Sequence, residues 1–299
     1  MKIWMIVATS LIVLGLIVFT VAFALMGLDF KELEMNKCTL NTHTVTESFS
    51  GVSIVTNTAK VDVLPSPDGQ VRIECWERPK RLHTVSVTDG TLTIALDDTR
   101  AWYDYISLFS ITSSKITVYL PAGAYGNLDV KTTTGDVSIA KDFTFSGTEI
   151  LLNTGDVCYG ASVTGNLKIK ATTGKIRIDS VDCAGAVGLC VSTGKTEISA
   201  LTCQELTSTG TTGDLTLENV TVAGLMSVKR DTGDVKFIGC DASEIEITTD
   251  TGDVTGSFRT DKIVWAKTDT GRVSIPKSTV GGHCEITTDT GDIHVEIMP

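Results

Sequence analysis

The feature that most constrains the fold is a short phrase repeated nine times between Lys131 and Pro299. Each copy contains Thr-Gly followed by a charged residue, with a β-rich segment on each side. Successive glycines are 19 or 20 residues apart, at Gly135, Gly155, Gly174, Gly194, Gly213, Gly233, Gly252, Gly271 and Gly291. A fixed period near 20 residues is typical of repeat architectures, in which each unit stacks on its neighbours.

Apolar residues alternate with polar ones on both sides of each glycine. Leu128 and Val130 precede Gly135, and Val137 and Ile139 follow it, each pair separated by one residue. A period of two predicts half-buried strands, and β-branched residues favour them. Glycine adopts positive φ at no steric cost, so it suits a tight bend between two strand arms.

One arm–bend–arm unit cannot bury its apolar face alone, so the units must pair with one another. Stacked coils of 19–20 residues predict an all-β, parallel β-solenoid of about nine coils over residues 127–299. Crossovers between parallel strands are nearly always right-handed, so a right-handed solenoid is expected. The alternative is a β-meander of hairpins. Hairpin turns prefer Asn-Gly or Asp-Gly, whereas the repeated pair is Thr-Gly, which favours stacking.

The N-terminal segment is strongly apolar. Ile3–Leu28 contains no charged residue and exceeds the roughly 20 residues that span a bilayer. Residues 1–28 are therefore expected to form a transmembrane signal-anchor helix. Lys2 precedes the run and Asp29 follows it, which predicts a cytoplasmic N-terminus in a single-pass cell-membrane protein. The alternative is a signal peptide cleaved after Ala24. Both interpretations export the remainder.

The segments beside the repeats differ in character. Residues 29–48 read as a juxtamembrane linker, and residues 49–126 as an irregular β-rich part that caps the solenoid. Within this part, an aromatic segment predicts either a contact patch for a ligand or a loop that covers the open end of the core; it contains Trp102, Tyr103, Tyr105 and Phe109. At the other end no capping segment follows residues 292–298. Because an exposed edge strand is a template for pairing, end-on self-association through the C-terminal coil is expected.

Several of these motifs carry a family resemblance. They are Lys115–Pro121, residues 128–139, and the later Asp-Thr-Gly-Asp series. The chain resembles the bacterial putative-adhesin family of uncharacterised β-strand-repeat proteins, from about Phe49 to the C-terminus. The resemblance implies a bacterial envelope protein with a β-solenoid fold, and some such families are associated with envelope-stress regulation. It implies no catalytic residues.

Acidic residues gather at the bends of the later repeats. Asp231, Asp234, Asp250 and Asp253 are expected on one edge, where stacked carboxylates would repel and calcium could relieve the repulsion. The alternative is a solvated bend whose carboxylates accept hydrogen bonds from local backbone. Lys175, Lys195 and Arg272 interrupt the series, which favours a charge-balanced face.

The chain has eight cysteines and no Cys-x-x-Cys. Cys183 and Cys203 each follow their glycines by nine residues in adjacent repeats, which predicts a spacing compatible with a disulfide. The alternative is a small apolar core position, because free cysteine behaves as a small hydrophobe.

A net charge of −11 argues against a nucleic-acid partner. The sequence contains no nucleophile, zinc-protease, phosphate-loop or dinucleotide motif, so neither an enzyme nor a cofactor is expected. A polysaccharide-cleaving enzyme would need a carboxylate cluster on one face, which the Asp series could imitate. The expected function is a membrane-anchored, adhesin-like module that binds a protein or a cell-surface polymer. The alternative is an envelope structural or stress-sensing component that docks a signalling partner or other copies of itself.

Overall fold

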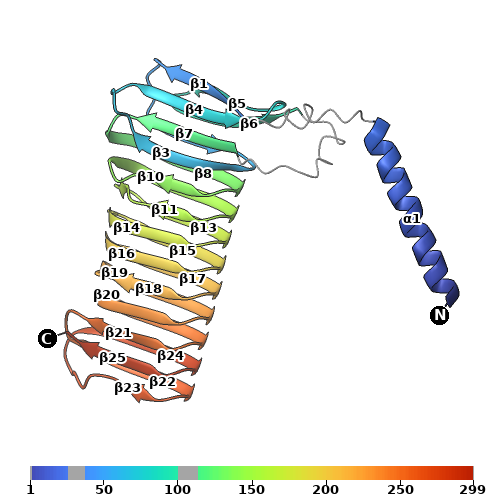
Figure 1. The fold of residues 1–299 in the computed structure, drawn as a ribbon. Helices are drawn as coiled ribbons and strands as arrows, with labels where there is room; N and C mark the ends of the chain where they lie inside the picture. The colour runs from blue at the N-terminus through green and yellow to red at the C-terminus, as the bar shows by residue number, and fades with distance from the viewer. Residues whose placement is uncertain (1, 26–37, 100–113, 299) are drawn as a thin grey trace.

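The computed structural model describes residues 2–25, 38–99 and 114–298. Helix α1 (Lys2–Leu25) precedes a long body made of strands (Figure 1). Among the described residues, no helix combines the length and apolar character that a membrane span requires. The predicted aromatic patch of Trp102, Tyr103, Tyr105 and Phe109 lies outside the described residues.

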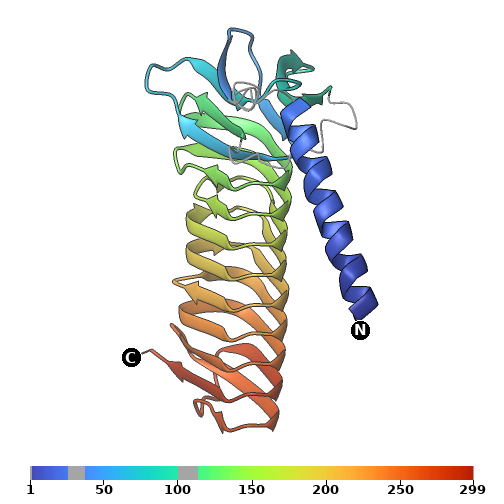
Figure 2. The same cartoon turned by 45° about the vertical axis from the view of Figure 1, so that its right-hand side comes forward.

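The body is a parallel β-solenoid of about nine regular turns, which confirms the prediction of an all-β, parallel solenoid. Figure 2 shows the coils piled along one axis, with irregular strands at the N-terminal end. The arms before the corners are the following strands: β8 (Gly123–Thr134), β10 (Phe143–Thr154), β13 (Leu167–Thr173), β15 (Ala186–Thr193), β17 (Glu205–Thr212), β19 (Thr221–Thr232), β20 (Val235–Thr251), β22 (Lys262–Thr270) and β24 (Gly282–Thr290).

The arms after the corners form a second parallel sheet. They are β9 (Val137–Ile139), β11 (Val157–Tyr159), β14 (Ile176–Asp182), β16 (Thr196–Cys203), β18 (Leu215–Glu218), the beginning of β20, β21 (Val254–Phe258), β23 (Val273–Ser274) and β25 (Ile293–Ile297). A short strand, β12 (Ser162–Val163), pairs with β10. Like residues lie over like: Val137 pairs with Val157, which pairs with Ile176. The alternating apolar residues therefore merge into one core.

The corner glycines all have positive φ, between 128° and 155°. Space adds a second requirement at these corners. A Cβ on Gly194 would lie 1.8 Å from the carbonyl oxygen of Gly174 in the neighbouring coil. Glycine is therefore needed both for the bend and for the close approach of successive corners.

The N-terminal end is built out of sequence order. β2 (Gly51–Val55) and β3 (Ala59–Pro65) form a coil that stacks on β8 and β9. The next coil outward contains β6 (Thr91–Asp98) and β7 (Ser114–Leu120). Three antiparallel strands complete this end: β1 (Thr39–Val45), β4 (Val71–Glu77) and β5 (Arg81–Thr88).

The C-terminal end is also interleaved. β24 pairs with β20 on one side and β22 on the other, and β25 lies between β21 and β23. The coil of Gly291 therefore lies inside that of Gly271. The expectation that the C-terminal coil is the free end of the stack is wrong. Among the described strands, the outermost pair is β22 and β23, which we call the end coil.

Core size explains this order. At paired positions, Ile286 of the inner coil lies beside Ala266 of the end coil, and Ile293 lies beside Val273, so the inner coil has the larger inward side chains. Burying an isoleucine contributes about 1.5–3 kcal/mol, so the coil with the larger inward side chains gains most from lying inside. Pro276 follows β23. It has no N–H to donate, which suits a position beside the free edge.

Candidate functional site

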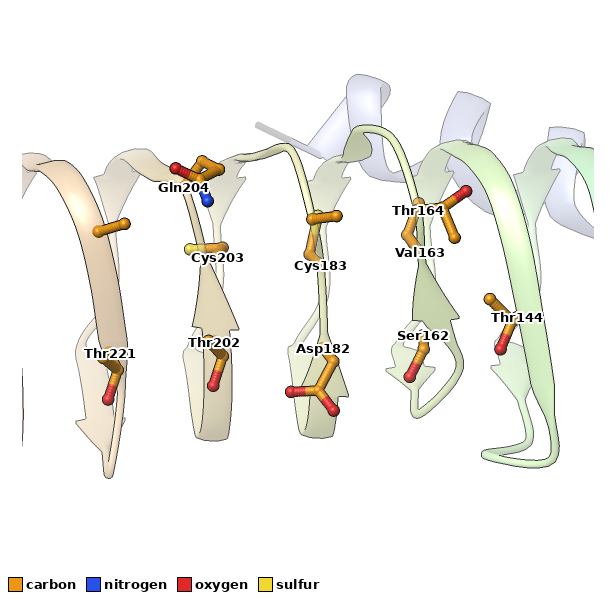
Figure 3. A pocket seen from close by; sticks show the side chains of 12 residues that line it. Thr144, Ser162, Val163, Thr164, Asp182, Cys183, Thr202, Cys203, Gln204 and Thr221 are labelled. Atoms are coloured by element: carbon orange, nitrogen blue, oxygen red, sulfur yellow. The ribbon is translucent and has the colours of Figure 1, made fainter.

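A shallow groove runs along the side of the solenoid between the end of one coil and the start of the next (Figure 3). It has a volume of about 400 Å³. Cys183, Cys203 and Val163 lie along its floor, with exposed Thr164 and Gln204 beside them.

The outer edge of the groove carries one polar residue per coil. Parallel pairing places Thr144 beside Ser162, Asp182 beside Thr202, and Thr221 beside both Thr202 and Asp241. Figure 3 shows the side chains of Ser162, Asp182, Thr202 and Thr221 at the same level on successive coils. We call this series the polar row: Thr144, Ser162, Asp182, Thr202, Thr221 and Asp241.

A second hollow of about 480 Å³ continues the groove, because both share Thr221 and Ala223. It contains Lys262, whose side chain is only 4% exposed and pairs with Asp241 at 2.5 Å. Lys262 Nζ also donates to Thr260 Oγ1 at 2.7 Å. The acidic end of the polar row is thus neutralised by a buried lysine.

Cys183 and Cys203 come from adjacent coils, as their spacing predicted. Both are buried free thiols in the structure. Burial raises the pKa of Cys203 to about 12 and also raises the pKa of Cys183. The Cys183 thiol donates to the carbonyl oxygen of Gly165 at 3.2 Å. These features match the small apolar core position that was the alternative to a disulfide.

The predicted calcium residues lie on two adjacent corners, and the carboxylates of Asp234 and Asp253 are engaged with backbone. Asp234 Oδ1 accepts the N–H of Asp253 at 2.9 Å, and Asp253 Oδ1 accepts the N–H of Asp292 at 2.8 Å. Asp214 and Asp136 act in the same way toward Asp234 and Asp156. The aspartates therefore link successive corners. Their partners are backbone groups of the neighbouring coil, whereas the alternative to calcium expected local backbone. Asp231 and Asp250 are half-buried and exposed, respectively.

The corners that carry lysine are balanced by an acid on the following arm. Glu197 lies 2.6 Å from Lys175, 2.9 Å from Arg177 and 3.5 Å from Lys195. The hydrogen bond and charge of Lys175, with those of Arg177, lower the pKa of Glu197. We call the corner aspartates that accept a backbone N–H from the next corner the Asp column. At the corners that carry lysine, a local ion-pair cluster replaces this column.

A buried titratable cluster, absent from the sequence-based predictions, lies in the N-terminal cap. Cys75 and Glu77 project from the same face of β4, and His83 comes from β5; these residues are 0%, 1% and 5% exposed. Their ligand atoms all lie within 4.8 Å of one another. We call these three residues the cap cluster. The sequence did contain a signal for this cluster. In the alternation Ile73-x-Cys75-x-Glu77, an acidic residue occupies a position that the strand period assigns to the core.

Comparison with known proteins identifies the family. No curated protein matches the chain. Among solved structures, a putative adhesin from Bacteroides fragilis is 14% identical, with 86% of this chain and 97% of that chain covered and a TM-score of 0.35. A putative adhesin from Parabacteroides distasonis is 11% identical, with 87% and 98% covered and a TM-score of 0.43. A putative lipid-binding protein from Parabacteroides distasonis is 12% identical, with 87% and 97% covered and a TM-score of 0.26. Residues 49–297 match the Toastrack DUF4097 family, and the chain belongs to that family.

Proposed function

We propose that this chain is a non-catalytic, extracytoplasmic binding module that holds an extended, hydroxyl-rich polymer of the cell surface along the groove. The observation that supports this most directly is the polar row, with one hydroxyl or carboxylate per coil from Thr144 to Asp241. Neighbouring coils of a parallel sheet are about 4.8 Å apart, so the row offers hydrogen-bonding groups at a regular interval. A polymer with repeated hydroxyl groups can use such a series, with each coil adding a similar weak contact.

The groove is open and lies mostly over small side chains, including Ala184 and Ala223. An open groove admits a chain that continues beyond both ends, whereas small-molecule sites usually enclose most of their ligand. Asp182 and Thr202 are exposed, so a polymer can reach them without rearrangement of the solenoid.

The proposal is tested by retention of the purified protein on insoluble cell-surface polysaccharide. The double variant Asp182→Ala/Thr202→Val removes two adjacent polar groups and is expected to reduce binding at least fivefold. Asp179→Ala is the matched control, because Asp179 is an exposed acid in the same coil and does not line the groove. Equal retention of all three proteins would count against the groove as the binding site.

We also propose that α1 tethers the solenoid to the cell membrane, with the N-terminus in the cytoplasm. The support is the uncharged run Ile3–Leu28 together with strongly exposed apolar side chains such as Trp4 and Leu11. The tethered protein is expected in the membrane pellet after alkaline carbonate extraction. Release of an intact, soluble solenoid would instead support a cleaved signal peptide.

A second candidate function is docking to other copies or to a signalling partner through the end coil. Trp265 and Val273 of the end coil are 50% and 43% exposed, and β22 and β23 each pair on one side only among the described strands. Light scattering over a hundredfold concentration range tests self-association. Val273→Asp is expected to lower the dimer fraction at a given concentration, while retention on polysaccharide stays unchanged.

A further inference from the structure

The cap cluster joins three chemically different ligand groups in a region that the proposed polymer site does not use. It contains a thiol, a carboxylate and an imidazole, all at least 95% buried. We propose that Cys75, Glu77 and His83 bind one Zn²⁺ ion, which joins β4 to β5 within the N-terminal cap.

Strand geometry brings the three ligands together. Cys75 and Glu77 are two residues apart on β4 and therefore point to the same side of the sheet. His83 reaches the same point from β5, and its Nδ1 lies 2.8 Å from Glu77 Oε1. All three ligand atoms lie within 4.8 Å of one another. Zinc bonds of about 2.0–2.3 Å require ligands roughly 3.3–3.8 Å apart, so only small side-chain adjustments are needed.

Charge also favours zinc. The 99% buried carboxylate of Glu77 is hydrogen-bonded to Asn41 Nδ2, to the N–H of His83 and to His83 Nδ1, and zinc would replace the last of these contacts with a bond to a cation. A Zn²⁺ ion held by one thiolate, one carboxylate and one neutral imidazole has no net charge. Thiolate and imidazole ligands suit zinc better than calcium or magnesium, which prefer oxygen.

Neighbouring residues orient the ligands. Asn41 Nδ2 donates to Glu77 Oε2 at 2.6 Å, while Oε1 faces the cluster and accepts the backbone N–H of His83. Thr56 Oγ1 lies 2.9 Å from His83 Nε2. Because a hydroxyl can donate or accept, Thr56 can partner the tautomer that places the lone pair of Nδ1 toward the metal. Such outer contacts fix the ring orientation in metal sites. Three protein ligands leave one position for water.

Binding changes the proton balance in a defined way. Burial, with the charge of Glu77, raises the pKa of Cys75 to about 12, so the free site holds a thiol. Burial lowers the pKa of His83, which keeps the imidazole neutral. Zinc therefore forms a Zn–S bond as the S–H bond breaks, and one proton is released to solvent.

The experiment measures metal content and cobalt absorption of the full chain after dialysis against Zn²⁺ or Co²⁺. We expect one zinc per wild-type chain and a sulfur-to-cobalt charge-transfer band. Cys75→Ser and His83→Asn should each lose at least tenfold in zinc affinity. Cys284→Ser is the matched control, because Cys284 is also a fully buried free thiol and lies outside the cluster. The absence of stoichiometric zinc, or of the charge-transfer band in the folded wild type, would overturn the proposal. So would zinc retention by Cys75→Ser equal to that of the control.

Discussion

The backbone N–H of Asp292 donates to Asp253 Oδ1 at 2.8 Å, although 39 residues separate them. Elsewhere in the column the linked corners are 19 or 20 residues apart. The next bond connects Arg272 N–H to Asp292 Oδ1 at 2.8 Å. The hydrogen bonds of the Asp column therefore follow the interleaved order of the coils. After the coil of Gly252 the chain first forms the end coil, which contains Gly271. It then returns through residues 275–281 and forms its last coil between these two.

The interleaved order predicts which cysteine pairs can be cross-linked. Thr287 Oγ1 lies 3.3 Å from Thr248 Oγ1 in the structure, and Lys267 pairs with Thr287 from the other side. We therefore expect Thr248→Cys/Thr287→Cys and Lys267→Cys/Thr287→Cys to react with a short thiol cross-linker. Neighbouring parallel positions fall within the usual Cα range for a disulfide, about 4.4–6.8 Å. Mass spectrometry of tryptic peptides measures the yield.

The control for this experiment is the pair Thr248→Cys/Lys267→Cys. In a sequentially stacked solenoid these two positions would be neighbours, whereas in the interleaved stack a whole coil separates them. Efficient cross-linking of the control pair, with none between positions 248 and 287, would show that the coils stack in chain order.

The repeat could predict the solenoid, but it could not predict this order. The gaps from Gly252 to Gly271 and from Gly271 to Gly291 are as regular as the others. Local pattern therefore permits either stacking. The choice depends on which inward residues gain more from being covered on both sides, such as Ile286 and Ile293 against Ala266 and Val273, and this is a property of the assembled core.

The corner hydrogen bonds predict a distinct effect of removing one carboxylate. Asp253→Ala leaves the N–H of Asp292 without its charged acceptor and is expected to lower the free energy of unfolding by about 0.5–2 kcal/mol. Asp253→Asn keeps an acceptor oxygen and should lose less. Asp250→Ala is the control, since Asp250 is exposed two residues before the same glycine. Urea unfolding compares the three, and an equal loss in Asp250→Ala would contradict a specific role for the bond.

Close packing of the corners predicts a large difference between two glycines. Gly194→Ala would place Cβ at 1.8 Å from the Gly174 oxygen and would force alanine to a φ of 145°. We expect a loss of more than about 3 kcal/mol, or failure to fold. In Gly188→Ala the new Cβ has nothing within 4 Å, so this control should change stability by less than about 1 kcal/mol. Thermal unfolding of both variants provides the measurement. Similar melting temperatures would refute the predicted crowding.

Buried thiols predict a loss of stability in alkaline solution. Burial raises the pKa of Cys284 from 9.0 to about 12. The unfolded thiol therefore ionises first, and the stabilisation is fully present below pH 9 and is lost as pH rises from 9 toward 12. Each such thiol contributes a slope of about 1.4 kcal/mol per pH unit in this range. Cys284→Val should reduce the slope between pH 9 and 11, whereas Cys158→Val, which alters an exposed thiol, should not. An unchanged slope in Cys284→Val would count against the raised pKa.

The sequence was less informative about side-chain clusters than about the repeat. It predicted that Asp234 and Asp253 lie on one edge and that Cys183 and Cys203 lie in adjacent coils. It did not predict the cap cluster, because Cys75 and His83 meet through antiparallel strands that lie outside the repeat. Their contact depends on the pairing of β1, β4 and β5 around the end of the solenoid.

Arg230 is a fully buried cation inside the core. Its guanidinium donates to Ser208 Oγ at 2.9 Å and to the Ser208 carbonyl oxygen at 3.1 Å. Gly210 makes room for it, since a Cβ there would lie 3.1 Å from the guanidinium carbon. Burial lowers the pKa of Arg230 to about 10, which shows the cost of desolvating the charge.

Replacing only Arg230 with Met removes that cost but leaves the Ser208 hydroxyl buried without this donor, so Arg230→Met should be nearly neutral. Arg230→Met/Ser208→Val removes both polar side-chain groups and places a β-branched residue at position 208, where the side chain faces the core. We expect the double variant to be about 1–3 kcal/mol more stable than the wild type, since well-packed apolar residues often replace buried charges favourably. Urea unfolding of the single and double variants measures the difference. A double variant less stable than the wild type would show that the guanidinium and its hydrogen bonds stabilise the core better than an apolar pair can.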